Sequence, residues 1–364
     1  MNNRKTVLLA VCFSFLVVTL YGQNDGDFVI EGTTLVEYQG TAMELVIPAN
    51  LGITEIDDSA FFECKNIRVI TIPASVVYIG DDVFSGCRSL TGIIVDERNP
   101  AYSSADGVLF DKAKTTLIKY PEGKQSRSYT IPTGVTKINY SALCECENLK
   151  VITIPASVVY IGNNAFLECR SLTGITVDER NPAYSSADGV LFDRAKTTLI
   201  KYPEGKQNRT YTIPTRVTSI ESGAFSECIY LTDINIPASV TSIGEKVFYG
   251  CRSIRSITIP VGVTSIGVSA FFGCVNLESI TIPSSVVSIE MGAFYGCVNL
   301  KSVALPESIV SIGNWVFIHC SNLSSINIPA SVTKIGDSAF YNTGLPAAIR
   351  AELVKRFGEN VFNF

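Results

Sequence analysis

The chain has 364 residues, of which 46% are hydrophobic and 17% are charged, and its formal net charge is −5. This composition is ample for a buried core, and the absence of a long basic run excludes an electrostatic nucleic-acid-binding surface. The sequence contains one histidine, which argues against acid–base catalysis by imidazole.

Residues 1–22 resemble a secretory signal peptide. Two cations, Arg4 and Lys5, precede an apolar run over residues 7–20, which is short for a membrane span, and Gly22 provides a small residue for cleavage. Nothing later in the sequence is long and apolar enough to be a transmembrane helix, so no span is expected after cleavage. The alternative for residues 1–22 is an uncleaved membrane anchor. The sequence therefore predicts export to the cell surface or the medium, with the periplasm as an alternative location.

Residues 23–47 are predicted to form an N-terminal β cap. The apolar segments 28–30 and 35–38 flank residues 31–34 as the strands of a β-hairpin flank its turn. A cap is needed because the open end of a stack of coils exposes unpaired backbone groups and apolar surface.

A repeat with a period of twenty-three positions fills most of residues 48–343. In each unit a proline follows an aliphatic residue, as at Pro214 and Pro237, and a cysteine stands fourteen residues after most of these prolines. The unit from Cys274 to Cys297 reads C-x-x-L-x-x-I-x-I-P-x-x-V-x-x-I-x-x-x-A-F-x-x-C. Ten prolines mark the units: Pro48, Pro73, Pro132, Pro155, Pro214, Pro237, Pro260, Pro283, Pro306 and Pro329. A fixed period of this size predicts a solenoid with parallel strand ladders.

Each unit contains two strand-like segments and a short helical turn. Residues 280–282 alternate apolar and hydroxyl side chains, and Pro283 ends that strand because it cannot donate to a ladder. Residues 286–289 form the second segment, which leads in most units to a glycine. We expect that glycine to occupy a tight corner with positive φ. The pair Ala293-Phe294 is predicted to form a short helical turn that buries the phenylalanine.

Two inserted segments, near residues 96–131 and 178–213, interrupt the repeat. They are nearly identical, VDERNPAYSSADGVLFDKAKTTLIKYPEGKQ and VDERNPAYSSADGVLFDRAKTTLIKYPEGKQ, which indicates duplication of a block whose length is the spacing from Cys64 to Cys146. Within each, GVLF and TTLIKYP are strand-like pieces joined by a turn, and this pattern predicts a hairpin. We expect the hairpin to extend from one edge of the stack.

The tyrosines of these insertions are the candidate ligand-binding residues. They are Tyr102, Tyr120, Tyr184 and Tyr202. Amphipathic aromatic side chains on a protrusion often anchor interfaces. The alternative is that these tyrosines pack the hairpin onto the solenoid.

The cysteines are predicted to form a column of buried thiols. Nine of them recur at one repeat position beside the phenylalanine column, where a free cysteine acts as a small hydrophobe. Disulfides between adjacent coils are the alternative in an exported protein. Cys144 lies outside the column, two residues before Cys146, and no third or fourth ligand for a metal ion is visible near this pair.

No catalytic, cofactor-binding or metal-binding residue is predicted. The adjacent acids of the insertions, such as Asp96-Glu97 and Asp178-Glu179, point to opposite faces of an extended segment and are interpreted as solvated loop charges. The sequence also lacks a phosphate-binding glycine loop and a nucleophile elbow. The protein is therefore not expected to be an enzyme.

Residues 344–364 are predicted to form a C-terminal capping helix. Pro346 is placed as a first-turn proline, apolar residues follow at helical spacing as far as Phe357, and Gly358 provides the stop.

The motif L-x-x-I-x-I-P-x-x-V-x-x-I-G-x-x-A-F-x-x-C resembles the BspA-like branch of bacterial leucine-rich repeats over about residues 28–343. The NPAYSS-DGVLF insertion is similar to a segment that recurs in that family. The resemblance implies a right-handed leucine-rich-repeat solenoid, β-rich with short helical turns, whose L-x-x-I-x-I-P strands line the concave face. Members of the family are typically exported or surface proteins, and some are linked to adhesion.

These observations together predict an exported, non-enzymatic protein-interaction scaffold. It would be adhesin-like and would bind host matrix proteins or proteins of a neighbouring cell surface. One alternative is an envelope carbohydrate-binding protein that uses hydroxyl and tyrosine faces to hold a glycan. A further alternative is a polysaccharide-active enzyme, because solenoids also host such enzymes.

Overall fold

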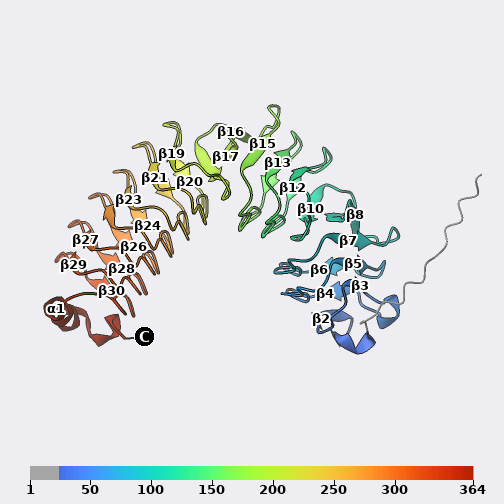
Figure 1. The fold of residues 1–364 in the computed structure, drawn as a ribbon, viewed down its shortest axis with the longest axis horizontal. Helices are drawn as coiled ribbons and strands as arrows, with labels where there is room; N and C mark the ends of the chain where they lie inside the picture. The colour runs from blue at the N-terminus through green and yellow to red at the C-terminus, as the bar shows by residue number, and fades with distance from the viewer. Residues whose placement is uncertain (1–23, 364) are drawn as a thin grey trace, which may run out of the picture.

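The computed structural model describes residues 24–363, which form an arc-shaped solenoid of about 13 turns (Figure 1). The predicted signal segment lies outside these residues. Two ladders of short parallel strands run along the arc, and the apolar side chains between them form the core. Among the described residues, no helix is long and apolar enough to cross a membrane.

The N-terminal end of the stack is a hairpin. After the 3-10 helix η1 (Asp25–Asp27), strands β1 (Phe28–Glu31) and β2 (Thr34–Tyr38) pair antiparallel around Gly32, whose φ of 64° requires the left-handed region. Strand β2 then pairs in parallel with the first strand of the inner ladder. The hairpin therefore covers the first turn with hydrogen-bonded backbone.

The first ladder lies on the inner side of the arc in Figure 1. It is built from the V-x-x-I segments, in which the isoleucine is buried or half-buried beneath the strand, and from the TTLIKYP segments of the two insertions. Its strands after β2 are β4 (Glu55–Ile56), β6 (Tyr78–Ile79), β10 (Thr116–Lys119), β12 (Lys137–Ile138), β14 (Tyr160–Ile161), β18 (Thr198–Lys201), β20 (Ser219–Ile220), β22 (Ser242–Ile243), β24 (Ser265–Ile266), β26 (Ser288–Ile289), β28 (Ser311–Ile312) and β30 (Lys334–Ile335).

The second ladder, built from the L-x-x-I-x-I-P segments, lies on the outer side. Its strands are β3 (Glu44–Val46), β5 (Val69–Ile72), β7 (Gly92–Val95), β11 (Ser128–Thr130), β13 (Val151–Ile154), β15 (Gly174–Val177), β19 (Thr210–Thr212), β21 (Asp233–Asn235), β23 (Ser256–Thr258), β25 (Ser279–Thr281), β27 (Ser302–Ala304) and β29 (Ser325–Asn327). The expectation that these strands line the concave face is wrong. In the C-terminal half the outer ladder divides into the separate pairs β19-β21, β23-β25 and β27-β29, whereas β24-β26-β28-β30 stays continuous inside. Curvature separates neighbouring turns more on the outside of an arc, which accounts for the difference.

A column of stacked phenylalanine rings runs through the core. The ring of Phe294 lies 5.3 Å from that of Phe271 and 5.4 Å from that of Phe317, nearly parallel to both. Tyr38 begins the N-terminal part of this column, and Phe362 lies against Phe340 at its C-terminal end. The rings are buried by successive hydrogen-bonded turns that follow each inner strand.

The cysteine column provides the backbone with weak hydrogen-bond donors. Each thiol of the column donates to the carbonyl oxygen of the residue 26 positions earlier, as from Cys297 to Phe271 (3.2 Å) and from Cys320 to Phe294 (3.1 Å). Cys64 to Cys320 are free thiols in the structure. Burial raises the pKa of Cys274 to about 12, because the thiolate would lose its hydration. A small side chain that carries a weak donor thus suits this position in coil after coil.

The cysteine column should resist thiol reagents until the protein unfolds. At pH 8 we expect the ten cysteines from Cys64 to Cys320 to react slowly in the native state, with the half-buried Cys64 and Cys144 reacting first. After denaturation without reductant, all ten should react. Colorimetric thiol titration measures both numbers, and fewer than ten thiols in the denatured sample would indicate disulfides and contradict the free column.

The glycine that follows many inner strands is needed for close packing, and the expectation of a positive φ there is wrong. A Cβ on Gly162 would lie 2.5 Å from the backbone nitrogen of Tyr140, and one on Gly244 would lie 2.5 Å from that of Ser222. Positive φ occurs instead two and six residues later, as at Asn164 (57°) and Glu168 (56°). These positions lie in the turns that follow each inner strand, so the chain changes direction there and not at the glycine.

The inserted segments are part of the stack, so the expectation of a hairpin extending from its edge is wrong. In the first insertion β8 (Tyr102–Ala105), β9 (Val108–Asp111) and β10 form an antiparallel meander, and β10 pairs in parallel with β12. In the second, β16 (Tyr184–Ala187), β17 (Val190–Asp193) and β18 repeat this arrangement before β20. The GVLF segments are buried because β9 and β17 face the core.

Each insertion interrupts the inner ladder. Strands β6 and β8 belong to different sheets, as do β14 and β16. At the first break the backbone nitrogen of Ile79 donates to the hydroxyl of Tyr102 (2.9 Å), and at the second that of Ile161 donates to the hydroxyl of Tyr184 (3.0 Å). A side-chain hydroxyl therefore replaces a ladder bond at both breaks.

A buried asparagine fastens each insertion to the preceding turn. The side-chain amide of Asn181 donates to the carbonyl oxygens of Pro155 (2.8 Å) and Val158 (2.9 Å). Its oxygen accepts from the backbone nitrogens of Ala183 (2.9 Å) and Tyr184 (2.7 Å). Asn99 makes the same four contacts in the first copy. This is the structural role of the asparagine in the NPAYSS motif.

The C-terminal end of the stack is covered by helix α1 (Ala347–Phe357) and the 3-10 helix η3 (Glu359–Val361). The guanidinium of Arg356 donates to the carbonyl oxygens of Ile328 and Pro329 (both 2.9 Å), which ties α1 to the last outer strand. Phe362 then completes the ring column, so the helix and the residues after it close the core.

Candidate functional site

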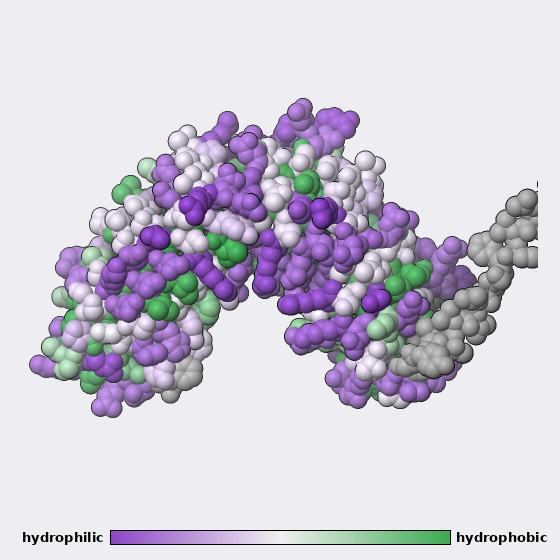
Figure 2. Space-filling view, viewed as in Figure 1, coloured by the Kyte–Doolittle hydropathy of each residue, from purple (hydrophilic) through white to green (hydrophobic). Residues whose placement is uncertain are grey.

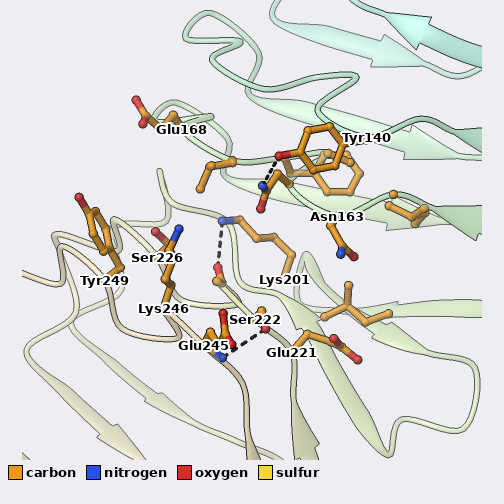
Figure 3. Close-up of a pocket in the computed structure, with 18 of the residues that line it drawn as sticks. Tyr140, Asn163, Glu168, Lys201, Glu221, Ser222, Ser226, Glu245, Lys246 and Tyr249 are labelled. Carbon is orange, nitrogen blue, oxygen red and sulfur yellow. Dashed lines mark hydrogen bonds between the residues drawn. The ribbon is translucent and has the colours of Figure 1, made fainter. Parts of the chain in front are cut away.

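A cleft of about 750 Å³ lies at the second break in the inner ladder, where β14 meets the second insertion (Figure 3). Besides Tyr140 and Tyr184, its walls come from three places in the chain. Residues 161–168 run from the end of β14, residues 193–201 belong to the insertion, and residues 221–227 with 245–249 follow β20 and β22. The cleft therefore lies where the ladder is interrupted.

A buried ion pair lies at the floor of the cleft. The Lys201 ammonium donates to Glu204 Oε1 at 2.8 Å and lies 3.4 Å from the carbonyl oxygen of Gly223. Lys201 is 6% exposed and Glu204 1%. Burial alone would lower the pKa of Lys201, but Glu204 and other groups outweigh burial and raise it, so the ammonium stays charged. Among the described residues Glu204 Oε2 has no hydrogen-bond partner.

Aromatic and polar side chains form the walls. The Tyr140 hydroxyl accepts a hydrogen bond from the Asn164 amide (3.1 Å), and the Ser222 hydroxyl accepts one from the backbone nitrogen of Glu245 (3.2 Å). Tyr249 lines the opposite wall in Figure 3. The cleft is thus bordered by tyrosines and hydrogen-bonding groups.

Three carboxylates on the walls have no ion-pair partner among the described residues, namely Glu221, Glu227 and Glu245. The carboxylate of Glu168 pairs instead with Arg170 at 3.0 Å. Burial raises the pKa of Glu227, two nearby arginines offset part of that rise, and the negative charges of Glu204 and Glu168 add to it. Because the net shift is upward, the anion of Glu227 is held in an unfavourable environment.

The duplicated block comprises residues 64–145 in its first copy and 146–227 in its second. At the position in the first copy that corresponds to the cleft, the structure is nearly closed. The equivalent cavity has a volume of about 30 Å³ and is lined by the matching residues 79–84, 118–119 and 139–141. Where the first copy has Tyr140 and Ser141, the second copy has Ser222 and Gly223. Loss of a tyrosine ring and of one further side chain accounts for the open cleft.

The model of the BspA-type leucine-rich repeat region, with six copies, matches residues 38–123, 119–208, 202–267 and 241–364. The chain belongs to the BspA-type leucine-rich repeat family. A leucine-rich cell surface protein from Faecalibacterium prausnitzii is 28% identical with a TM-score of 0.57, over 84% of this chain and 94% of that one. A leucine-rich repeat protein from Eubacterium ventriosum is 25% identical with a TM-score of 0.56, over 86% and 91%. No curated protein matches the chain.

The predicted binding tyrosines of this BspA-type protein do not form one surface. Tyr120 and Tyr202 are 1% and 0% exposed, so the expectation that they project from a hairpin is wrong. They end the strands that join the inner ladder, and their rings pack on Tyr129 and Tyr211 at 4.7 and 4.9 Å. Tyr102 and Tyr184 are half-buried and accept the ladder-break hydrogen bonds. Of the four, Tyr184 lines the cleft.

The described part of this BspA-type chain contains no group of three or more His, Cys, Asp and Glu side chains that could hold a metal ion. Cys144 is half-buried, and burial raises the pKa of its thiol to about 12, which makes it a poor nucleophile at neutral pH. Sequence reasoning missed the cleft. The signal was present in the differences between the two copies of the block, above all Ser222 in place of Tyr140.

Proposed function

We propose that this protein is an exported, non-enzymatic scaffold that binds other proteins, in an adhesin-like role. The family and the cell-surface relative from Faecalibacterium prausnitzii support a protein-interaction function. The arc presents a long surface built on hydrogen-bonded ladders, and Figure 2 shows hydrophobic patches interspersed with hydrophilic side chains on the face in view. A rigid surface of mixed polarity is typical of protein interfaces, because little ordering is needed on binding.

The observation that carries this proposal is a pair of exposed Val-Tyr dipeptides on the inner ladder. Val77 and Tyr78 are 49% and 53% exposed at β6, and Val159 and Tyr160 are 54% and 52% exposed at β14. Both dipeptides stand beside a ladder break. Other turns have threonine and serine there, as in the dipeptide 218–219. Tyrosine is one of the residue types enriched at the positions that dominate binding energy in protein interfaces.

The proposed partners are host matrix proteins or proteins of a neighbouring cell surface. Tyr184 remains in the proposed binding surface because it lines the cleft beyond β14. The leucine-rich-repeat family supports a binding scaffold over an enzyme. We therefore treat the surface as the functional part of the molecule.

The inner dipeptides can be tested with substitutions that the chain itself uses. A variant with V77T, Y78S, V159T and Y160S should fold normally, because other turns carry Thr-Ser at these positions. Its affinity for a partner found on a panel of matrix and cell-surface proteins should fall by ~10-fold or more. Biolayer interferometry gives the dissociation constants.

The matched control lies on the outer ladder. Ile94 is 49% exposed in β7, and the second block has threonine at the equivalent position, 176. The variant I94T should bind as tightly as the unmodified protein. Equal affinity of the quadruple variant, or an effect of I94T alone, would contradict an inner-face site.

A further inference from the structure

We propose that the cleft at the second ladder break binds a basic side chain, an arginine or a lysine, of the protein partner. This inference rests on the proposed function, because it assumes that the ligand is a protein. It concerns a different part of the surface from the Val-Tyr dipeptides, so the two can be tested separately.

The first support is the charge of the walls. Glu221, Glu227 and Glu245 line the cleft without an ion-pair partner among residues 24–363, and Lys246 is the one cation that lines it similarly unpaired. Lys201 is already neutralised by Glu204 at the floor. The walls therefore carry an excess of negative charge, which a guanidinium or ammonium group would neutralise.

The second support is the different pairing of one arginine in the two blocks. In the first block Arg88 lies 3.6 Å from Glu145, the counterpart of Glu227. In the second block Glu168 stands where the first has a glycine, and Arg170, the counterpart of Arg88, pairs with it at 3.0 Å. Glu227 is thereby left without an internal partner at the position where the cleft has opened.

The third support is a buried hydroxyl that faces the cleft. Ser226 is 3% exposed and lines the cavity, so its hydroxyl is placed to meet a group bound there. Figure 3 draws it among the residues that line the cleft. Its counterpart in the first block is Cys144, whose thiol is a weaker hydrogen-bonding group. A serine hydroxyl both donates and accepts, so it suits the N–H groups of an arginine or lysine side chain.

The shape and the aromatic groups also suit a long cationic side chain. A volume of about 750 Å³ can hold an arginine side chain together with the backbone around it. The rings of Tyr140, Tyr184 and Tyr249 line the cleft, and tyrosine faces attract guanidinium groups. A neutral saccharide would satisfy hydrogen-bonding groups but would leave the three carboxylates unpaired.

The test uses three peptides that differ in one side chain. They are acetyl-Gly-Arg-Gly-amide, its lysine analogue and its citrulline analogue, in which the guanidinium is replaced by a neutral urea of nearly the same shape. Ligand-observed NMR on the purified protein gives each dissociation constant. The arginine peptide should bind ~10-fold or more tightly than the citrulline peptide, because charge-assisted hydrogen bonds are lost in the latter.

Two variants place the binding in the cleft. The double variant E227Q/E245Q removes two charges and should weaken the arginine peptide ~10-fold. The variant S222Y restores the tyrosine of the first block and should abolish binding, and Tyr140 shows that the fold accommodates a tyrosine at that repeat position. The control E145Q changes the paired glutamate of the first block and should leave binding unchanged.

Several results would overturn the proposal. These are equal affinity for the arginine and citrulline peptides, unchanged binding in E227Q/E245Q, and binding of maltotriose without binding of the arginine peptide. Failure of the proposed protein-binding function would give a different result, namely no binding to any protein on the panel of matrix and cell-surface proteins. A cleft that discriminates the peptides supports the inference whichever partner the panel identifies.

Discussion

Replacing Phe294 with alanine is expected to lower the free energy of unfolding by about 3–5 kcal/mol. The side chain is fully buried, and its ring stacks between those of Phe271 and Phe317 at 5.3 and 5.4 Å. Truncation would remove apolar contacts and leave a cavity that two neighbouring turns share. The neighbours cannot collapse into it, because both ladders fix their spacing.

Chemical denaturation followed by circular dichroism measures the effect. The control is Phe62→Ala, one of the exposed aromatic residues at 57%, which should change the free energy by no more than about 0.5 kcal/mol. Because repeat arrays can unfold in parts, the midpoint and the slope should both be compared. Similar losses for the two variants would mean that the ring column is not the main source of stability.

Replacing Asn181 with alanine is expected to cost at least about 3 kcal/mol, although no hydrophobic group is removed. Its amide donates to the carbonyl oxygens of Pro155 and Val158 and accepts from the backbone nitrogens of Ala183 and Tyr184. Alanine would leave these four backbone groups without side-chain partners. Asn181 is itself 0% exposed, so water does not easily replace it.

The two blocks provide a matched pair for this prediction. Asn99→Ala removes the same four contacts and should cost a similar amount. The control Asn299→Ala, at a half-buried asparagine whose side chain bonds those of Asn276 and Asn322 (both 3.1 Å), should cost about 1 kcal/mol or less. Thermal and chemical denaturation give the three values. Near-neutral effects of both buried substitutions would contradict the role assigned to the asparagine.

Much of the architecture follows from the repeat alone. Its constant period predicts stacking, and stacking places like residues above one another. For that reason the columns through Phe294 and Cys297 could be predicted with their neighbours. The family resemblance is confirmed, because the motif recurs in many copies along the chain.

The side of the arc on which each strand lies could not be read from the repeat. Both the V-x-x-I and the L-x-x-I-x-I-P segments have one apolar face. The hydrophobic pattern therefore does not indicate which ladder lies on the inner side of the arc. The expectation of a positive φ at the glycine after each inner strand was wrong for a similar reason. Glycine is required there because the neighbouring turn packs closely against it, as the backbone of Tyr140 does against Gly162. The sequence of a single unit does not show this contact between turns.

The placement of the insertions could not be predicted, because a hairpin pattern does not show which further strand its second arm pairs with. Strand β10 is one arm of the hairpin and also a member of the inner ladder, through its pairing with β12. That pairing buries Tyr120. The cleft was missed because it arises from differences between two copies, and sequence reasoning concentrated on what the copies share.

The measurement that tests the central claim most directly is binding of the purified protein to matrix proteins, cell-surface proteins and glycans presented on separate surfaces. The account predicts saturable binding to at least one protein, weakened ~10-fold or more by the V77T/Y78S/V159T/Y160S variant. Binding to glycans alone, or to no surface at all, would contradict the proposed role as a protein-interaction scaffold.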